Sequence, residues 1–145
     1  MTDFVLVHGA GTGGWLWDDV ANRLRAAGHR VLAPDLRGVG DRSAEGGTDV
    51  RLSDHIDQVV ELVVTERLDR IVLVGFSYGG FVVTGAADRL GTRVSRLIYL
   101  EAFLPIPGRS FFDLLPDPVR QAMQRAADEA GGCLLYTSPS PRDRS

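Results

Sequence analysis

Ser77 lies in a sequence pattern that can turn its hydroxyl into a nucleophile. Residues 75–79 read Gly-Phe-Ser-Tyr-Gly; an apolar, β-branched run at 71–74 precedes them, and a segment with helical spacing at 81–90 follows. Strand, G-x-S-x-G and helix together are typical of a nucleophile elbow, a tight turn that holds the serine in a strained conformation. Side chains two residues before or after the serine would collide with the neighbouring strand or helix, which explains the glycines. We therefore predict that Ser77 is a nucleophile at the carboxyl edge of a sheet.

The glycine-rich loop at residues 9–14 admits a different chemistry. It satisfies G-x-G-x-x-G directly after an apolar run, and Asp35 closes the next strand about 20 residues further on, as a ribose-binding acid would. A dinucleotide-binding domain is therefore an alternative interpretation. His8 directly before the first glycine, and an elbow that such a domain does not need, argue against it.

The segments around Ser77 alternate between two patterns. Short apolar runs predict strands at 4–7, 30–33, 71–74 and 96–100. Helical spacing predicts helices at 15–27, 53–68, 81–90 and 117–130; Val20 is expected on the buried face of the first, and Ser53 as the N-cap of the second. This alternation predicts an α/β fold with a parallel sheet flanked by helices. Beyond Pro105 the pattern changes to that of a helical cap.

The composition is ordinary for a globular domain and excludes several classes of function. The 145 residues are 44% hydrophobic and 24% charged, with a net charge of −3, so no basic surface for nucleic acid is expected. No apolar run approaches the roughly 18 residues of a membrane span, and no signal peptide is recognisable, so we expect a cytoplasmic location. No metal or organic cofactor is implied, and the oligomeric state stays open.

The last thirteen residues differ from the rest of the chain. Residues 133–143, Cys-Leu-Leu-Tyr-Thr-Ser-Pro-Ser-Pro-Arg-Asp, look like one reading frame of a transposase-type sequencing adapter. A natural Ser/Pro-rich disordered terminus is the alternative. We therefore divide the chain into residues 1–105, a hydrolase-like core; 106–132, the start of a cap; and 133–145, a non-native tail, and expect the natural protein to continue beyond Gly132.

Four motifs together resemble the α/β-hydrolases, closest to the branch of small esterases and hydroxynitrile lyases that includes plant methyl-salicylate and methyl-jasmonate esterases and bacterial relatives. They cover residues 4–105 in the expected order. The motifs read His-Gly-Ala at 8–10, Pro-Asp-Leu-Arg-Gly-Val-Gly at 34–40, Gly-Phe-Ser-Tyr-Gly at 75–79 and Tyr-Leu-Glu-Ala-Phe-Leu-Pro at 99–105. The resemblance implies an α/β-hydrolase fold, truncated here before its last strands.

The resemblance also implies roles for individual residues. The backbone N–H groups of Ala10 and Tyr78 would form an oxyanion hole beside Ser77. In this fold the serine is followed along the chain by an acid and then a histidine, but no histidine follows Ser77. Glu101 closes the fourth strand and is a possible acid, although this branch normally places the acid after the next strand.

The three histidines all precede Ser77. We expect His8 to shape the oxyanion loop, and His29 and His55 to be exposed to solvent. The triad is thus incomplete. The resemblance implies a carboxylesterase that acts on small apolar esters through an acyl-enzyme, and a 145-residue chain that is inactive. A hydroxynitrile lyase on the same fold and a non-enzymatic small-molecule receptor are the alternatives. Phe103, Phe111 and Phe112 line a substrate pocket or pack in the core.

Overall fold

The computed structural model of the chain describes residues 1–39, 42, 44 and 49–129. Strands and helices alternate, as the sequence predicts. In chain order the elements are β1 (Asp3–Val7), the 3-10 helix η1 (Gly14–Trp17), α1 (Asp18–Ala26), β2 (Arg30–Leu32), α2 (Leu52–Thr65), β3 (Ile71–Phe76), α3 (Gly79–Leu90), the 3-10 helix η3 (Gly91–Arg93), β4 (Val94–Leu100), the 3-10 helix η4 (Phe112–Leu114) and α4 (Asp117–Glu129).

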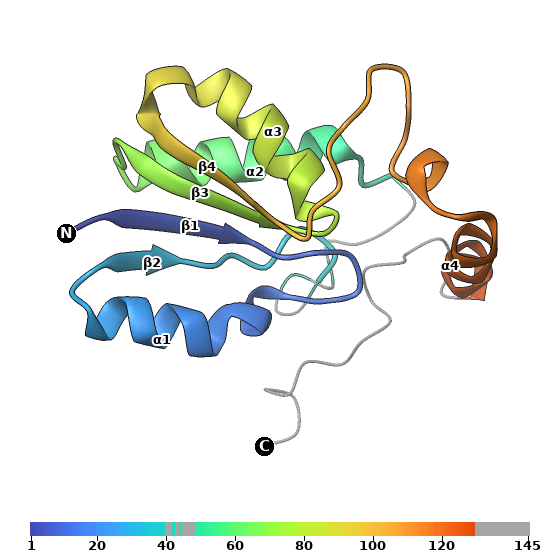
Figure 1. The fold of residues 1–145 in the computed structure, drawn as a ribbon, viewed down its shortest axis with the longest axis horizontal. Helices are drawn as coiled ribbons and strands as arrows, with labels where there is room; N and C mark the ends of the chain where they lie inside the picture. Colours follow the sequence, from blue (N-terminus) through green and yellow to red (C-terminus); the bar gives the residue numbers. More distant parts are fainter. Residues whose placement is uncertain (40–41, 43, 45–48, 130–145) are drawn as a thin grey trace.

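Four parallel strands form one sheet in the order β2-β1-β3-β4 (Figure 1). The two central strands, β1 and β3, are paired so that Val7 lies beside Gly75. On the other side of β3, Phe76 lies beside Leu100 of β4. Because carboxyl ends of parallel strands meet at one edge, the segments that follow these three strands converge around Ser77. The predicted parallel sheet flanked by helices is confirmed.

Helices cover the two faces of the sheet and divide the core into two layers. On one face, α1 buries Ala21 against Leu6 of β1 and Val72 of β3. On the other face, α2 and α3 pack over the alternate residues of the same strands. The buried residues of this second layer include Val5, Val7, Val59, Val63, Leu73, Val82, Val83 and Ala86. The short apolar runs in the sequence reflect strands that are buried on both faces.

Two details of the helices differ from the prediction. The segment from residue 15 starts as a 3-10 turn, so Ala21 instead of Val20 faces the sheet, and Val20 is 43% exposed. Ser53 is not an N-cap, because α2 already begins at Leu52. Arg51 takes the cap position, and its backbone N–H donates to the Asp54 carboxylate at 2.7 Å.

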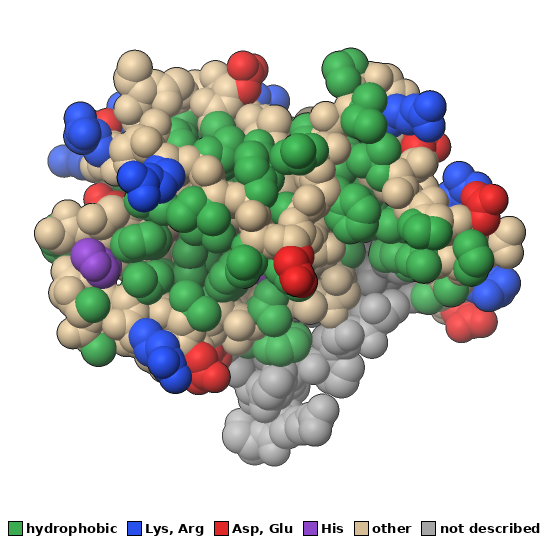
Figure 2. Space-filling model, viewed as in Figure 1, with side chains coloured by type: hydrophobic (Ala, Val, Ile, Leu, Met, Phe, Trp, Pro, Cys, Tyr) green, Lys and Arg blue, Asp and Glu red, His purple; other side chains and the backbone are tan. Residues whose placement is uncertain are grey.

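β4 is one of the two outer strands of the described sheet, and apolar side chains on it are exposed. Ile98, Tyr99 and Leu100 are among them. Figure 2 shows hydrophobic side chains gathered over the strands on the face in view. Edge strands with exposed apolar side chains are normally covered by further structure.

The chain beyond β4 leaves the sheet. Figure 1 shows α4 apart from the strands, at the end of the segment for which a cap is predicted. The division at residue 105 stays a prediction, and residues 130–132 and the predicted tail 133–145 lie outside the described residues. Within the described part of the chain, no helix is both long and apolar enough to cross a membrane.

Leu73 tests the importance of the second core layer. It is fully buried in β3, so Leu73→Ala removes packed atoms and leaves a cavity that central strands cannot close. We expect a loss of about 3 kcal/mol in the free energy of unfolding, measured by urea denaturation. Val64→Ala, on the exposed side of α2, is the matched control and should change it by less than about 0.5 kcal/mol. Equal losses in both variants would contradict the assignment of this core.

Candidate active site

Ser77 occupies a tight turn between β3 and α3. Its φ angle is +52°, in the left-handed region that side-chain-bearing residues rarely adopt. A Cβ at Gly75 would lie 2.7 Å from the carbonyl oxygen of Gly79, and one at Gly79 would lie 2.7 Å from the carbonyl oxygen of Val7. These approaches are too close for any side chain, so the glycines at both positions are required. The predicted elbow geometry is present.

Two other segments hold the elbow. A Cβ at Gly9 would lie 2.9 Å from the Cβ of Ser77, so the loop after β1 packs directly against the serine. On the opposite side, the carbonyl oxygen of Ser77 accepts hydrogen bonds from the N–H groups of Gly80 at 3.0 Å and Phe103 at 3.1 Å. The strained turn is thus fixed by its own helix and by the segment that follows β4.

Ala10 and Tyr78 follow the two residues that touch at this point, Gly9 and Ser77. Among the residues that the structure describes, no group accepts a hydrogen bond from the backbone N–H of either. Two N–H groups without an acceptor beside a nucleophile are what an oxyanion hole requires. Their predicted role remains a prediction.

His8 is fully buried and shapes the loop after β1. Its Nε2 accepts a hydrogen bond from the backbone N–H of Leu36 at 3.0 Å, so the proton is on Nδ1, which donates to the carbonyl oxygen of Gly9 at 2.8 Å. Burial lowers the pKa of His8, and the ring is neutral. Both nitrogens are used, so His8 has no lone pair to accept the Ser77 proton.

His55 is the residue that sequence reasoning misplaced. The sequence predicts a side chain exposed to solvent, but His55 is buried, with only 3% of its surface exposed. Its Nε2–H donates to the carbonyl oxygen of Arg37 at 3.1 Å, and its Nδ1 accepts from the hydroxyl of Tyr78 at 2.9 Å. Burial lowers the pKa of His55. The signal was available, because residues 55, 59 and 63 recur every fourth position on one helix face, and Val59 and Val63 are core residues.

His29 and Glu101 stand apart from these contacts. His29 lies beside the start of β2 and is half-buried rather than exposed; its Nδ1 accepts from the backbone N–H of Thr2 at 3.2 Å. Because β1 and β2 both begin there, His29 is at the end of the sheet away from Ser77. Glu101 follows β4, is exposed and has a φ of +44°. Its role as the acid stays a prediction.

Asp35 does not act as the alternative interpretation requires. Its Oδ1 accepts a hydrogen bond from the backbone N–H of Gly14 at 2.7 Å, so the carboxylate fastens the glycine-rich loop to the segment after β2. A ribose-binding acid would instead present its oxygens to a ligand. This contact argues against a dinucleotide site at residues 9–14.

The phenylalanines that the sequence places either in a substrate pocket or in the core pack around one ring, that of Phe111. Phe111 makes edge-to-face contacts, with ring centroids 5.1–6.0 Å apart, to four aromatic neighbours. These are Tyr78, Phe81, Phe103 and Phe112. Such contacts stabilise beyond the area that they bury, so Phe111 anchors the segment after residue 105 onto the start of α3.

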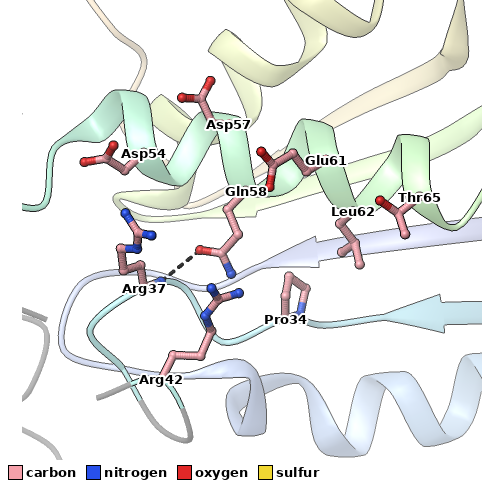
Figure 3. A pocket seen from close by; sticks show the side chains of 9 residues that line it. All are labelled: Pro34, Arg37, Arg42, Asp54, Asp57, Gln58, Glu61, Leu62 and Thr65. Carbon is pink, nitrogen blue, oxygen red and sulfur yellow. Dashed lines mark hydrogen bonds between the residues drawn. The ribbon is translucent and has the colours of Figure 1, made fainter. Parts of the chain in front are cut away.

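A charged groove of about 390 Å³ lies between α2 and the segment after β2 (Figure 3). Arg37 and Arg42 face the carboxylates of α2 across it. Gln58 connects the two sides of the groove, because its Oε1 accepts from the backbone N–H of Arg37 at 2.9 Å and its Nε2 donates to the carbonyl oxygen of Asp35 at 2.7 Å. The groove is lined by residues of α2 and this segment, and Ser77 is not among them.

The two buried histidines predict that acid destabilises the fold. Their pKa values are lowered from 6.5 in the folded state, so between that value and the folded pKa the unfolded chain binds more protons. Stability is therefore lost as the pH falls below about 6.5. We expect lower urea midpoints at pH 5 than at pH 7.5, and a smaller difference when both histidines are replaced by asparagine. A midpoint that is constant or rises on acidification would contradict this.

Comparisons with known proteins agree with this geometry. The sequence profile of the alpha/beta hydrolase family matches residues 4–143. A carbendazim hydrolyzing esterase from Nocardioides sp. (strain SG-4G) is 51% identical over 116 residues, which are 80% of this chain and 48% of the relative. A probable esterase, PIR7A, from Oryza sativa subsp. indica is 31% identical over 140 residues, 96% of this chain and 53% of its own.

A solved structure shares the fold. An extracellular alpha/beta-hydrolase from a Paenibacillus species, described as a structural and functional homologue of tobacco Salicylic Acid Binding Protein 2, superposes with a TM-score of 0.82 at 29% identity; the match covers 91% of this chain and 53% of that protein. The chain thus spans about half the length of the relatives it matches. The elbow, the parallel sheet and the family profile agree, and the chain belongs to the alpha/beta hydrolase family.

Proposed function

We propose that the complete protein is a serine carboxylesterase that acts on small, apolar esters. The observation that carries the proposal is Ser77, held at a φ of +52° at the tip of a strand-turn-helix with Gly9 packed against it. Glycine would adopt this positive φ at a lower cost than serine. The serine is therefore better explained by the chemistry of its hydroxyl than by the shape of the turn. The names of the relatives, a carbendazim hydrolyzing esterase and a probable esterase, support hydrolysis over the lyase alternative.

The reaction proceeds through an acyl-enzyme. A histidine supplied beyond this chain takes the proton from Ser77 Oγ as the oxygen attacks the ester carbonyl, and an acid that follows Ser77 in the chain orients that histidine. The N–H groups of Ala10 and Tyr78 stabilise the oxyanion. The carbon–oxygen bond to the alcohol breaks, and the alcohol leaves with the proton from the histidine. Water then attacks the acyl-serine by the same route and releases the carboxylic acid.

Two proteins test this proposal. One is a full-length protein that contains this chain and has the length of its relatives; the other is the Nocardioides esterase with its matched 48% replaced by the matched residues of this chain, which are 51% identical to it. We expect both to hydrolyse p-nitrophenyl acetate and to lose this activity on Ser77→Ala. Ser53→Ala, at an exposed position of α2, is the matched control and should keep it. Carbendazim and methyl esters of aromatic acids then define the substrate range.

The alternatives give different results. A folded protein that binds such esters without releasing product is a receptor. One that releases cyanide from a cyanohydrin and leaves esters intact is a hydroxynitrile lyase. Hydrolysis that survives Ser77→Ala at an unchanged rate would overturn the assignment of the nucleophile.

A further inference from the structure

His55 joins the elbow to the segment after β2. One ring nitrogen accepts from the Tyr78 hydroxyl at 2.9 Å, and the other donates to the carbonyl oxygen of Arg37 at 3.1 Å. The tautomer is fixed by these partners, because a carbonyl oxygen can only accept and the hydroxyl supplies its own proton. His55 comes from α2, so three separate elements meet at one buried ring.

The segment that His55 contacts is itself held rigidly. Gln58, three residues further along α2, bonds the backbone of both Asp35 and Arg37. His8 bonds Leu36 from the other side. Residues 35–37 are thus a hub that is tied through His8 to the loop of Ala10 and through His55 to Tyr78. The two proposed oxyanion donors share one support.

Apart from its hydrogen bond to His55, the Tyr78 side chain makes apolar contacts, which include packing against the core layer under α2 and α3. Its ring stacks on Phe81, with centroids 6.4 Å apart, and meets the edge of Phe111 at 5.5 Å. These contacts involve the ring, whereas the hydrogen bond to His55 fixes its hydroxyl end. Burial raises the pKa of Tyr78, so the hydroxyl keeps its proton and remains a donor to His55.

We propose that His55 is a positioning residue: through the Tyr78 hydroxyl it fixes the peptide whose N–H faces the oxyanion on Ser77. The inference rests on the proposed function, since it supposes that this N–H stabilises a transition state. An oxyanion donor gains its effect from being pre-positioned, and small displacements are costly. His55 touches neither substrate nor the reacting atoms; it acts through Tyr78.

The proposal is tested in the complete enzyme with two variants and their combination. His55→Phe keeps an aromatic ring but removes the acceptor, and Tyr78→Phe removes only the donor oxygen. Each should lower kcat about 10- to 10²-fold with little change in KM. Because the two changes break the same bond, the double variant should lose no more than either single variant. His55→Asn, which places an amide oxygen near the position of Nδ1, should restore most of kcat.

His29→Phe is the matched control. His29 lies at the far end of the sheet, so its substitution should leave kcat unchanged. The pH profile gives a further readout. Protonated Nδ1 cannot accept from Tyr78, so the parent should lose kcat in acid at a point that Tyr78→Phe no longer shows. The groups that act on the charge of His55 are Asp54 on its own helix, Arg37 on the hub and His8 on the loop after β1.

The 145-residue chain supplies a readout that does not need activity. Imidazole nitrogen NMR should show His55 neutral, with the proton on Nε2, and its Nδ1 resonance should move in Tyr78→Phe while that of His8 stays. If the parent enzyme shows no Ser77-dependent turnover, the proposed function fails, and this measurement alone decides whether the bond exists. Additive losses, a change confined to KM, or full activity in Tyr78→Phe would overturn the proposal. Tyr78→Phe carries the test if His55→Phe does not fold.

Discussion

The purified 145-residue chain is expected to hydrolyse p-nitrophenyl acetate no faster than its Ser77→Ala variant. A serine hydroxyl is a poor nucleophile unless a base takes its proton. The structure places all three histidines, and none can do so: His8 and His55 each use both ring nitrogens, and His29 lies at the other end of the sheet. Relative to the proposed complete enzyme, the lack of a histidine that can accept the Ser77 proton should cost about 10⁶ in kcat.

The measurement compares initial rates of p-nitrophenol release for the chain, its Ser77→Ala variant and the complete enzyme at equal concentration. Subtracting the variant removes the background from surface groups. The complete enzyme prepared in the same way is the positive control, since it shows that the substrate and assay suit this site. A Ser77-dependent rate in the short chain that exceeds the Ser77→Ala background would contradict the prediction and would indicate a base among the residues present.

The sequence was sufficient for the parts of the fold that depend on local geometry. An elbow needs glycines because backbone approaches backbone, as the 2.7 Å distances from Gly75 and Gly79 show, so the motif alone predicts the turn. Strands buried on both faces need continuous apolar runs, so β1 and β3 were also predictable. The parallel direction of the strands followed from the alternation of strands and helices along the chain.

The contacts of His55 could not be obtained in the same way. The spacing of residues 55, 59 and 63 indicates the buried face of the helix. A polar residue in the first turn is usually solvated, however, and only the partner that it meets explains its burial. That partner, Tyr78, is 23 residues away and reaches it through the tertiary packing of α2 on α3. Val20 points away from the sheet, and Ala21 toward it, for a related reason. A 3-10 turn rotates the helix that follows, and periodicity does not show where such a turn ends.

The oxyanion donors remain predictions for a physical reason. The structure shows two N–H groups beside Ser77 without an acceptor among the described residues, but an oxyanion exists only during the reaction. The catalytic acid is harder to identify than the oxyanion donors. Glu101 lies at the correct edge of the sheet, yet an acid is recognised by the histidine that it orients, and no described histidine is available to it.

Gly80→Ala should destabilise the fold strongly, although alanine is the better helix former. A Cβ at residue 80 would overlap the carbonyl oxygen of Phe103 and lie 2.9 Å from the Cβ of Ala102. The obstacle is backbone, and it cannot retreat without breaking the hydrogen bond from the Phe103 N–H to Ser77. We expect a loss of about 3 kcal/mol in the free energy of unfolding.

Gly85→Ala, one and a half turns further along α3, separates this clash from the general effect of adding a methyl group. A Cβ there would overlap Cδ1 and lie 3.0 Å from Cγ1 of Ile56, and these are side-chain atoms that can shift, unlike the backbone at Phe103. The gain in helix propensity, about 1 kcal/mol, should offset the adjustment and leave stability nearly unchanged. Urea unfolding of the two variants and the parent measures the difference. The contrary results are that Gly80→Ala unfolds at the parent's midpoint or that both variants lose stability equally. Either result would contradict the packing of the segment after β4 against the elbow, and with it the support that this segment gives to Ser77.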